Sequence, residues 1–310
     1  MPTAQYSELD NFIIRRFGKN ALQRLNNQVR GGGNNEKGTT HEQSFAIYKL
    51  AKFYDELAND DIEITSQIRG FVDDLVVFNR TSNEKRSYQL KDCLSVSWNS
   101  EKGIAPYFHR QYIIDTEVSG LSLSQTTLVN ANERVHNLRK DDIPSHIESH
   151  TNCMYFPNET LSWLLANDTS FRQEMNKLCS FPDNDDKLLS VSQTLMGVWC
   201  SRDRNTESDT KITNLIAQAR KNAKPDFFLP LAGEQFVLDE NITKILDSFE
   251  EISYEVSGGF LVYSYRLFSG QSKSKIGTES FQNICNVIIN ESPKTVRELF
   301  LLLMGTGDGA

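Results

Sequence analysis

The stretch GFVDDLVVFNRTSNEKRSYQLKDC, from Gly70 to Cys93, decides the fold of this chain. Its first part, Phe71 to Phe78, is rich in Val, Leu and Phe, which suit a pleated and mostly buried surface, and it predicts a strand. The polar run from Asn79 to Arg86 has the Asn, Ser and Thr composition of a hairpin connection. Residues Ser87 to Leu94 predict the returning strand, so the stretch is expected to form an antiparallel hairpin.

The hairpin carries four polar side chains that are expected to meet at one edge of a sheet. Side chains alternate between the two faces of a strand, so Gln89 and Lys91 share a face. An antiparallel return brings that face beside Asp73 and Asp74, which alternation sends to opposite faces. One carboxylate, one amide oxygen and one ammonium group are therefore expected to converge.

Such a trio suits metal-assisted hydrolysis of a phosphodiester. A hard cation such as Mg²⁺ takes oxygen ligands from few protein groups, keeps several waters and accepts the phosphate as a further ligand. An aspartate supplies the anchoring charge, and Gln89 or a neighbouring carbonyl supplies a neutral oxygen. The cation lowers the pKa of a bound water, while Lys91 orients that water or stabilises charge on the phosphate.

A helix that carries Glu42 precedes the hairpin. It opens with Thr-Thr-His-Glu at residues 39–42 and is expected to run to about Asn59. Its apolar stripe consists of Ile47, Leu50, Tyr54 and Leu57. Thr39 and Glu42 also match a capping box, in which the glutamate reaches back to the N-cap amide. This pattern predicts that Glu42 is a helix cap, which does not exclude a further role, and the neighbouring His41 is expected at the surface.

Three segments, taken in order, resemble the core of the PD-(D/E)xK nucleases, in the variant where Gln replaces the acidic residue of the last half-motif. The segments are Gly38–Glu42 (GTTHE), Val72–Val76 (VDDLV) and Tyr88–Lys91 (YQLK). The likeness is strongest to the endonuclease domain of bacterial anti-phage systems, found in CBASS effectors and in the nuclease subunit of Lamassu-type systems. The resemblance covers roughly the first third of the chain.

The resemblance implies an α/β, restriction-endonuclease-like fold, with a mixed sheet flanked by helices. It implies that Asp74 is the principal metal ligand, because the acting Asp of the family directly precedes the apolar run, with Asp73 as the alternative. Glu42 and Gln89 become accessory metal ligands, and Lys91 becomes the catalytic lysine. The implied cofactor is Mg²⁺ or Mn²⁺.

Two features count against an enzyme that cuts DNA. The net charge is −8, whereas a protein that holds duplex DNA through its own electrostatics usually shows a basic face. Asp92 follows Lys91 where the family more often has a small or basic residue, and a carboxylate there could pair with the lysine. The alternatives are a non-catalytic interaction subunit that keeps the nuclease fold as a scaffold, or a nuclease directed at RNA.

Composition describes an ordinary globular chain of 310 residues, with 38% hydrophobic residues and a mean hydropathy of −0.46. No window approaches the roughly 20 apolar residues of a membrane span, and the first residues lack the basic start and apolar core of a signal peptide. The five cysteines are scattered without CxxC spacing, which favours a reducing compartment. We therefore expect a cytoplasmic protein.

Four regions are expected along the chain. Residues 1–37 form a helical arm and a Gly/Asn linker, 38–150 the nuclease core, 151–304 a mostly helical regulatory or assembly domain, and 305–310 a disordered tail. Within the arm, Ser7–Val29 predicts one or two helices and Arg30–Lys37 predicts the linker. The arm is locally basic through Arg15, Arg16, Lys19 and Arg24.

The rest of the chain predicts mainly helices. A helix is expected within Asn99–Asp115 and a strand at Leu121–Asn130. His146 and His150 have the i, i+4 spacing of a metal site, but no fourth ligand is evident and a loop or helix surface is favoured. Strands are expected within Tyr254–Phe268. Later helices are expected at Asn158–Cys179, Leu188–Cys200, Thr210–Ala223, Asn241–Phe249, Ser280–Asn290 and Thr295–Met304.

For function, the resemblance implies a Mg²⁺-dependent endodeoxyribonuclease that acts as the effector of an anti-phage or anti-plasmid complex. Such an effector stays inactive until a partner triggers it, and an SMC-like or other ATPase is the implied partner. Double-stranded DNA is the expected substrate. Cutting both strands needs two sites, so a homo-oligomer is expected, and no membrane is involved.

Overall fold

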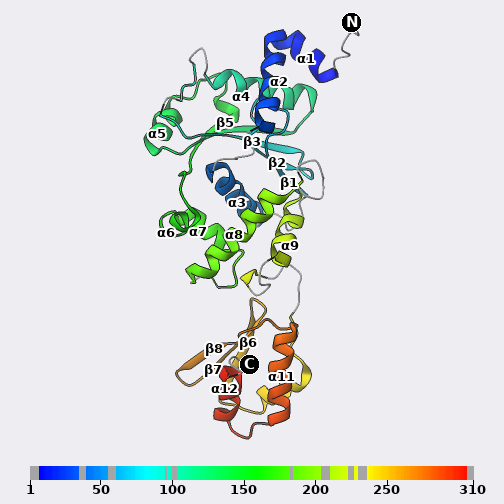
Figure 1. The fold of residues 1–310 in the computed structure, drawn as a ribbon, viewed down its shortest axis with the longest axis vertical. Helices are drawn as coiled ribbons and strands as arrows, with labels where there is room; N and C mark the ends of the chain where they lie inside the picture. Colours follow the sequence, from blue (N-terminus) through cyan, green and yellow to red (C-terminus); the bar gives the residue numbers. More distant parts are fainter. Residues whose placement is uncertain are drawn as a thin grey trace. The chain divides into compact units, whose positions relative to one another are not determined.

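The computed structural model describes residues 7–34, 40–54, 61–94, 96–99, 103–181, 184–203, 210–222, 227–229 and 236–305. Within these residues the protein has twelve α-helices, a five-stranded mixed sheet and a three-stranded sheet, which confirms the α/β class. The chain divides into two compact units, Met1–Ala223 and Lys224–Ala310 (Figure 1). None of the helices in the described ranges is long and apolar enough to cross a membrane.

The first unit is built on the five-stranded sheet, whose strands lie side by side in chain order. The first three strands are antiparallel, the fourth is parallel to the third, and the fifth is parallel to the fourth. The predicted strand at Leu121–Asn130 is confirmed, while the first and fifth strands were missed because each has only four or five residues. The strands are β1 (Ile62–Thr65), β2 (Leu75–Asn79), β3 (Glu84–Lys91), β4 (Leu123–Asn130) and β5 (Thr151–Tyr155).

The predicted hairpin is formed by β2 and β3, which pair with Leu75 opposite Tyr88. Its strands are offset from the prediction, since the turn occupies only residues 80–83. The prediction that residues 71–74 belong to the first strand was wrong. The N–H groups of Phe71 and Val72 donate to Oε1 of Gln111, at 2.7 and 3.4 Å, rather than to a neighbouring strand.

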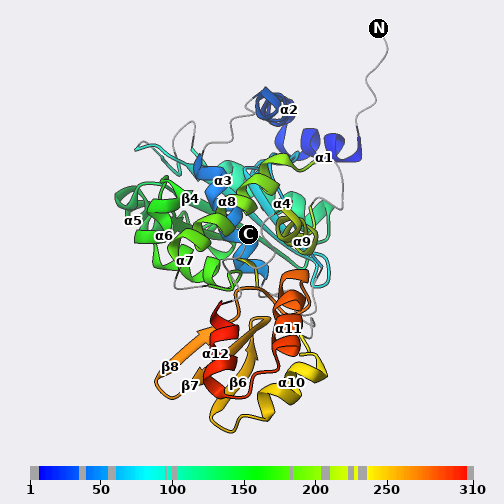
Figure 2. The ribbon, with the colours of Figure 1, turned by 60° about the horizontal axis from the view of Figure 1, so that its bottom comes forward.

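Helices cover both faces of this sheet (Figures 1 and 2). Helix α3 (Thr40–Tyr54) packs on the face that carries Tyr88, whose ring centroid lies 5.3 Å from that of Phe45. Helices α8 (Asp185–Ser201) and α9 (Ile212–Asn222) pack beside α3. Helix α4 (Ala105–Ile113) covers the opposite face, because Phe108 shares a buried cluster with Leu128, the register partner of Gln89. Gln89 and Lys91 therefore lie on the α4 face.

Two helices form the N-terminal arm, as predicted: α1 (Glu8–Phe17) and α2 (Lys19–Asn34). Both pack against Phe71, at the start of the loop that leads into β2. The linker prediction was wrong for residues 30–34, which continue α2. Once a helix has been nucleated, each further residue adds one hydrogen bond, so the chain extends the helix into the glycines. Residues 35–37 lie outside the described part.

The other predicted helices of the first unit are present. The segment Asn99–Asp115 contains α4, and the segment Asn158–Cys179 contains α6 (Leu161–Asn167) and α7 (Thr169–Asn176). Helix α5 (Glu133–Asp141) was not predicted. The sequence suggested a boundary near residue 150, whereas in the structure β5 begins at Thr151 and α6 to α9 belong to the first unit.

The second unit contains α10 (Glu240–Asp247), a three-stranded antiparallel sheet, and two closing helices. The predicted strand pair turns at Gly258 and Gly259, whose φ angles of +59° and +86° favour glycine. A third strand was not predicted. The elements are β6 (Ile252–Ser257), β7 (Phe260–Tyr265), β8 (Phe268–Gln271), α11 (Glu279–Glu291) and α12 (Val296–Gly305). Residue 305 belongs to α12, and the rest of the predicted tail, 306–310, lies outside the described residues.

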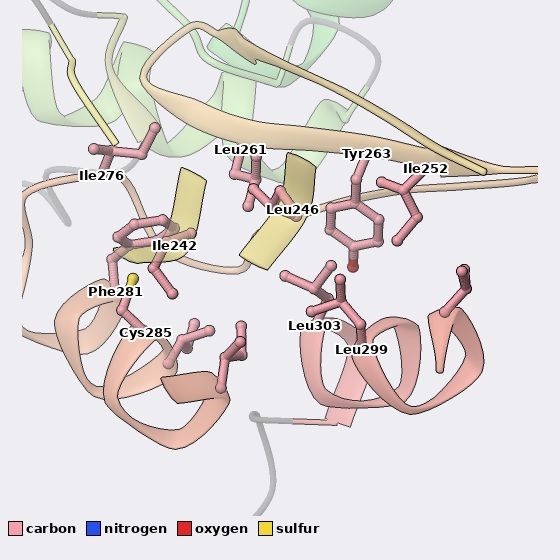
Figure 3. Packing of buried hydrophobic residues seen from close by; sticks show 13 residues of the cluster. Ile242, Leu246, Ile252, Leu261, Tyr263, Ile276, Phe281, Cys285, Leu299 and Leu303 are labelled. Carbon is pink, nitrogen blue, oxygen red and sulfur yellow. The ribbon is translucent and has the colours of Figure 1, made fainter. Parts of the chain in front are cut away.

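The second unit has its own hydrophobic core between the sheet and the helices (Figure 3). Tyr263 of β7 lies beside Leu299 and Leu303 of α12, and Leu261 faces Ile242 and Leu246 of α10. Buried apolar side chains from α10, β6, β7, α11 and α12 form this core and hold the unit together.

We expect Leu299→Ala to lower the free energy of unfolding of this unit by about 3 kcal/mol, because a fully buried leucine leaves a cavity. Amide hydrogen exchange in β7 and α11 measures the loss. The matched control is Leu301→Ala on the same helix, where the side chain is 58% exposed and the change should be small. Equal losses in both variants would contradict this packing.

Candidate active site

The loop before β2 is held by α4 and by a glycine. Gln111 of α4 accepts hydrogen bonds from the backbone of Phe71 and Val72 through Oε1. A Cβ atom on Gly70 would lie 2.9 Å from that same oxygen, so a larger residue would displace the Gln111 carboxamide from the loop. Gly70 and Gln111 thereby set the path of the chain that presents Asp73 and Asp74. The sequence carried no local signal for the role of Gln111.

Asp74 is docked on β3. Its Oδ2 accepts hydrogen bonds from the backbone N–H of Leu90, at 2.7 Å, and from Nε2 of Gln89. Asp73 and Asp74 precede β2, so the alternation of side chains along a strand does not apply to them. Gln89, which was expected to offer a neutral oxygen, donates its amide to Asp74 and so positions that carboxylate.

Asp73 has an unusual electrostatic environment. Burial raises its pKa to about 7, and the charges of Asp74 and Glu42 act in the same direction, while Lys91 opposes them. Burial also raises the pKa of Asp74, and Lys91 opposes that shift. Asp73 therefore lies within electrostatic range of Glu42, Asp74 and Lys91, and Asp74 lies within range of Lys91. The structure therefore gathers residues that are far apart in sequence at one end of the sheet.

Lys91 is a half-buried lysine at the end of β3. Across the described ranges its ammonium group makes no ion pair closer than 4 Å. The sequence suggested that Asp92 could pair with Lys91, but this pairing does not occur. Instead, Oδ2 of Asp92 accepts a hydrogen bond from Asn158 at 2.7 Å. Lys91 thus lies within electrostatic range of Asp73 and Asp74 and is not paired with Asp92.

His41 lies in the first turn of α3 and is buried, so the expectation of a surface histidine was wrong. Its Nε2 lies 2.8 Å from the carbonyl oxygen of Phe156, and the two rings are stacked with centroids 6.0 Å apart. Burial lowers its pKa, while the Phe156 carbonyl and the charges of Asp92 and Asp74 oppose that shift. The predicted N-cap Thr39 lies outside the described residues.

Asn130 was missed by sequence reasoning. It ends β4, is the register partner of Lys91, and its side chain is almost completely buried. Neither polar atom of its carboxamide has a hydrogen-bond partner in the described part of the protein. A polar residue at the end of the predicted strand Leu121–Asn130 was the available signal.

His146 and His150, which have the i, i+4 spacing of a metal site, do not lie on an α-helix. His150 ends a short 3₁₀ turn and stacks on Tyr112, with ring centroids 3.8 Å apart. Burial, together with the charges of His109 and His146, lowers the pKa of His150 to about 4. The segment is therefore a turn, as one of the two favoured interpretations predicted, but His150 is buried and does not lie on the surface.

The carboxylates of Asp73 and Asp74, next to the start of β2, are oxygen donors of the kind and number that a hard cation takes from a protein. Among the described residues, no three His, Cys, Asp or Glu side chains form a group that could hold a metal ion. Magnesium is usually held by one or two carboxylates, with water and phosphate oxygens completing the shell. Asp73 and Asp74 supply two carboxylates, and Glu42 lies within electrostatic range of Asp73. The residues present therefore fit the implied Mg²⁺ or Mn²⁺.

The fold and the site define a mixed α/β protein with a carboxylate, amide and lysine cluster at one end of its larger sheet. Comparisons of the chain with protein-family models, curated proteins and solved structures gave no match. The chemistry of the cluster is thus the basis for a functional conclusion.

Proposed function

We propose that this chain is a metal-dependent DNA endonuclease of the PD-(D/E)xK class with a restriction-endonuclease-like core. The observation that carries the proposal is Lys91, whose ammonium has no ion pair in the described part and lies within electrostatic range of Asp73 and Asp74. The order of elements supports it, because the Glu42 helix, the Asp-bearing strand start, the Gln-x-Lys strand and the covering helix follow one another as the resemblance implies.

Each residue of the cluster has a role that follows from its contacts. Asp74 would hold the cation, with Gln89 and the Leu90 N–H fixing its carboxylate. Asp73 would supply a second carboxylate ligand for the cation, or Glu42 would do so through a water. Lys91 would orient the attacking water or donate to the phosphate as its charge increases. When bound, Mg²⁺ or Mn²⁺ would lower the pKa of a water and neutralise phosphate charge.

The N-terminal arm supplies positive charge on the helices that pack against the loop before Asp73 and Asp74. Arg15, Arg16, Lys19 and Arg24 are exposed on α1 and α2. These helices pack on Phe71, three residues before Asp74. The arm is a candidate contact for the DNA backbone, and it offsets part of the objection from the net charge of −8.

The wider role extends the same proposal. The chain would act in the cytoplasm on double-stranded DNA as the effector of an anti-phage or anti-plasmid complex. A partner such as an SMC-like or other ATPase would release its activity, and a homo-oligomer would supply two sites for two strands. The net charge of −8 favours one alternative, a scaffold that keeps the fold without catalysis, and RNA is the alternative substrate.

Plasmid cleavage tests the proposal directly. With MgCl₂ or MnCl₂, and with any proteins that co-purify, the wild-type chain should nick or linearise supercoiled plasmid. Lys91→Ala should slow cleavage by at least about 100-fold, the usual effect of removing a group that stabilises transition-state charge. Lys221→Ala, an exposed lysine at the end of α9, is the control and should cut normally. An inert wild-type protein, with co-purifying proteins and phage DNA present, would favour the scaffold.

A further inference from the structure

Asn130 is an exception among the buried polar residues of β4. Its side chain is only 1% exposed, yet neither Oδ1 nor Nδ2 has a partner in the described part of the protein. Its backbone is satisfied, because its carbonyl oxygen accepts the N–H of Phe156 at 3.0 Å. Burying an amide without hydrogen bonds costs about 1–3 kcal/mol for each group, and native proteins rarely leave one so. The carboxamide is therefore expected to have a ligand.

The position of Asn130 indicates where that ligand lies. Asn130 is paired in register with Lys91, and in a sheet paired residues place their side chains on the same face. Gln89 shares that face, and its amide binds Asp74. Asn130 thus extends the proposed catalytic cluster onto the next strand, on the side of Lys91 away from β2.

Thr126 shows that β4 can satisfy its buried polar groups. It lies four residues earlier on the same face and is fully buried. Its hydroxyl lies 3.1 Å from Oγ1 of Thr151 and 3.3 Å from the carbonyl oxygen of His150. The lack of partners is therefore particular to the end of the strand that meets Lys91.

We propose that Asn130 is a substrate-binding residue of this site and that its carboxamide binds the phosphate at the bond to be cut. Nδ2 donates to a non-bridging phosphate oxygen beside the Lys91 ammonium, and Oδ1 accepts a hydrogen bond from a water on that phosphate. A phosphodiester suits both groups, because it offers acceptor oxygens for an amide and negative charge for a lysine. The inference rests on the proposed nuclease function.

The test compares Asn130→Leu with Thr126→Val in the 310-residue chain. The probe is a fluorescein-labelled DNA duplex in CaCl₂, with plasmid cleavage in MgCl₂ as the second readout. Asn130→Leu should fold with an unchanged or higher melting temperature, since it removes an unsatisfied buried amide. Its Kd for DNA should rise by about tenfold or more, equivalent to about 1.4 kcal/mol. Thr126→Val should melt earlier and bind DNA normally.

Each other outcome has a definite meaning. If the wild type cuts and Lys91→Ala does not, but Asn130→Leu binds and cuts normally, a trapped water satisfies Asn130 and the inference falls while the nuclease stands. A large loss of stability in Asn130→Leu with normal DNA affinity likewise makes Asn130 structural. If the wild type neither binds nor cuts DNA, both proposals fall.

Discussion

The Asp73→Asn variant will be more stable than the wild-type protein at pH 8, and its advantage will shrink as the pH falls toward 4. Burial and the neighbouring charge of Asp74 raise the pKa of Asp73 from 3.8 to about 7. The folded protein therefore holds a proton that the unfolded chain releases near pH 4. Wild-type stability is greatest below that pH and declines as the pH rises through about 7. The amide of the Asp73→Asn variant resembles the protonated acid and cannot lose a proton in this pH range. The stability of the variant therefore does not decline for this reason.

The expected size of the effect follows from the width of that pH window. Each pH unit between about 4 and 7 changes the difference in free energy of unfolding between Asp73→Asn and the wild type by about 1.4 kcal/mol. The total difference is therefore at most about 4 kcal/mol, and it is smaller where solvent screens the charge. Urea unfolding at pH 5 and pH 8 measures it. Asp141→Asn, at an exposed position at the end of α5, is the control and should show no such trend.

The same variant also tests the metal. A cation bound between Asp73 and Asp74 stabilises the folded protein by mass action, so MgCl₂ or MnCl₂ should raise the melting temperature of the wild type at pH 8. Asp73→Asn should lose most of that gain. Equal gains in the two proteins would place any cation elsewhere.

Asp115→Ala should destabilise the first unit by about 3 kcal/mol, because it leaves the largely buried ammonium group of Lys85 without its partner. Asp115 is fully buried in the π-helical turn Ile114–Val118 that follows α4. Its Oδ1 accepts hydrogen bonds from Nζ of Lys85, at 2.7 Å, and from Nε2 of Gln111, at 2.9 Å. Its Oδ2 accepts one from Oγ of Ser124 at 2.8 Å.

The loss should extend to the site, because Gln111 is also the residue that holds the loop before Asp73. Denaturant unfolding and plasmid cleavage measure the two effects in parallel. Glu117→Ala, exposed in the same turn, is the control and should leave both unchanged. Ser124→Ala removes one neutral donor and should cost only about 1 kcal/mol. If Asp115→Ala lowered the free energy of unfolding only slightly, the ammonium group of Lys85 would be hydrated in the variant and the prediction would be wrong.

The sequence by itself determined the local elements. The hairpin of β2 and β3, the strand β4 and most helices were predictable, because runs of Val, Leu and Phe or a 3.6-residue period depend only on neighbouring residues. The shared face of Gln89 and Lys91 also followed from alternation within one strand. The nearness of Gln89 and Asp74 was expected from the hairpin, but the hydrogen bond that Gln89 donates to Asp74 was not.

Only the tertiary structure decided how the elements meet. Gln111 takes up the N–H groups of residues 71 and 72, which places both aspartates in a loop, and no local pattern contains that long-range hydrogen bond. The pairing of Lys91 with Asn130 depends on the register of two parallel strands joined through α4. The raised pKa of Asp73 depends on burial by the assembled unit. Residue types and periods are local properties of a sequence, whereas burial, register and electrostatic neighbours exist only once distant segments pack together.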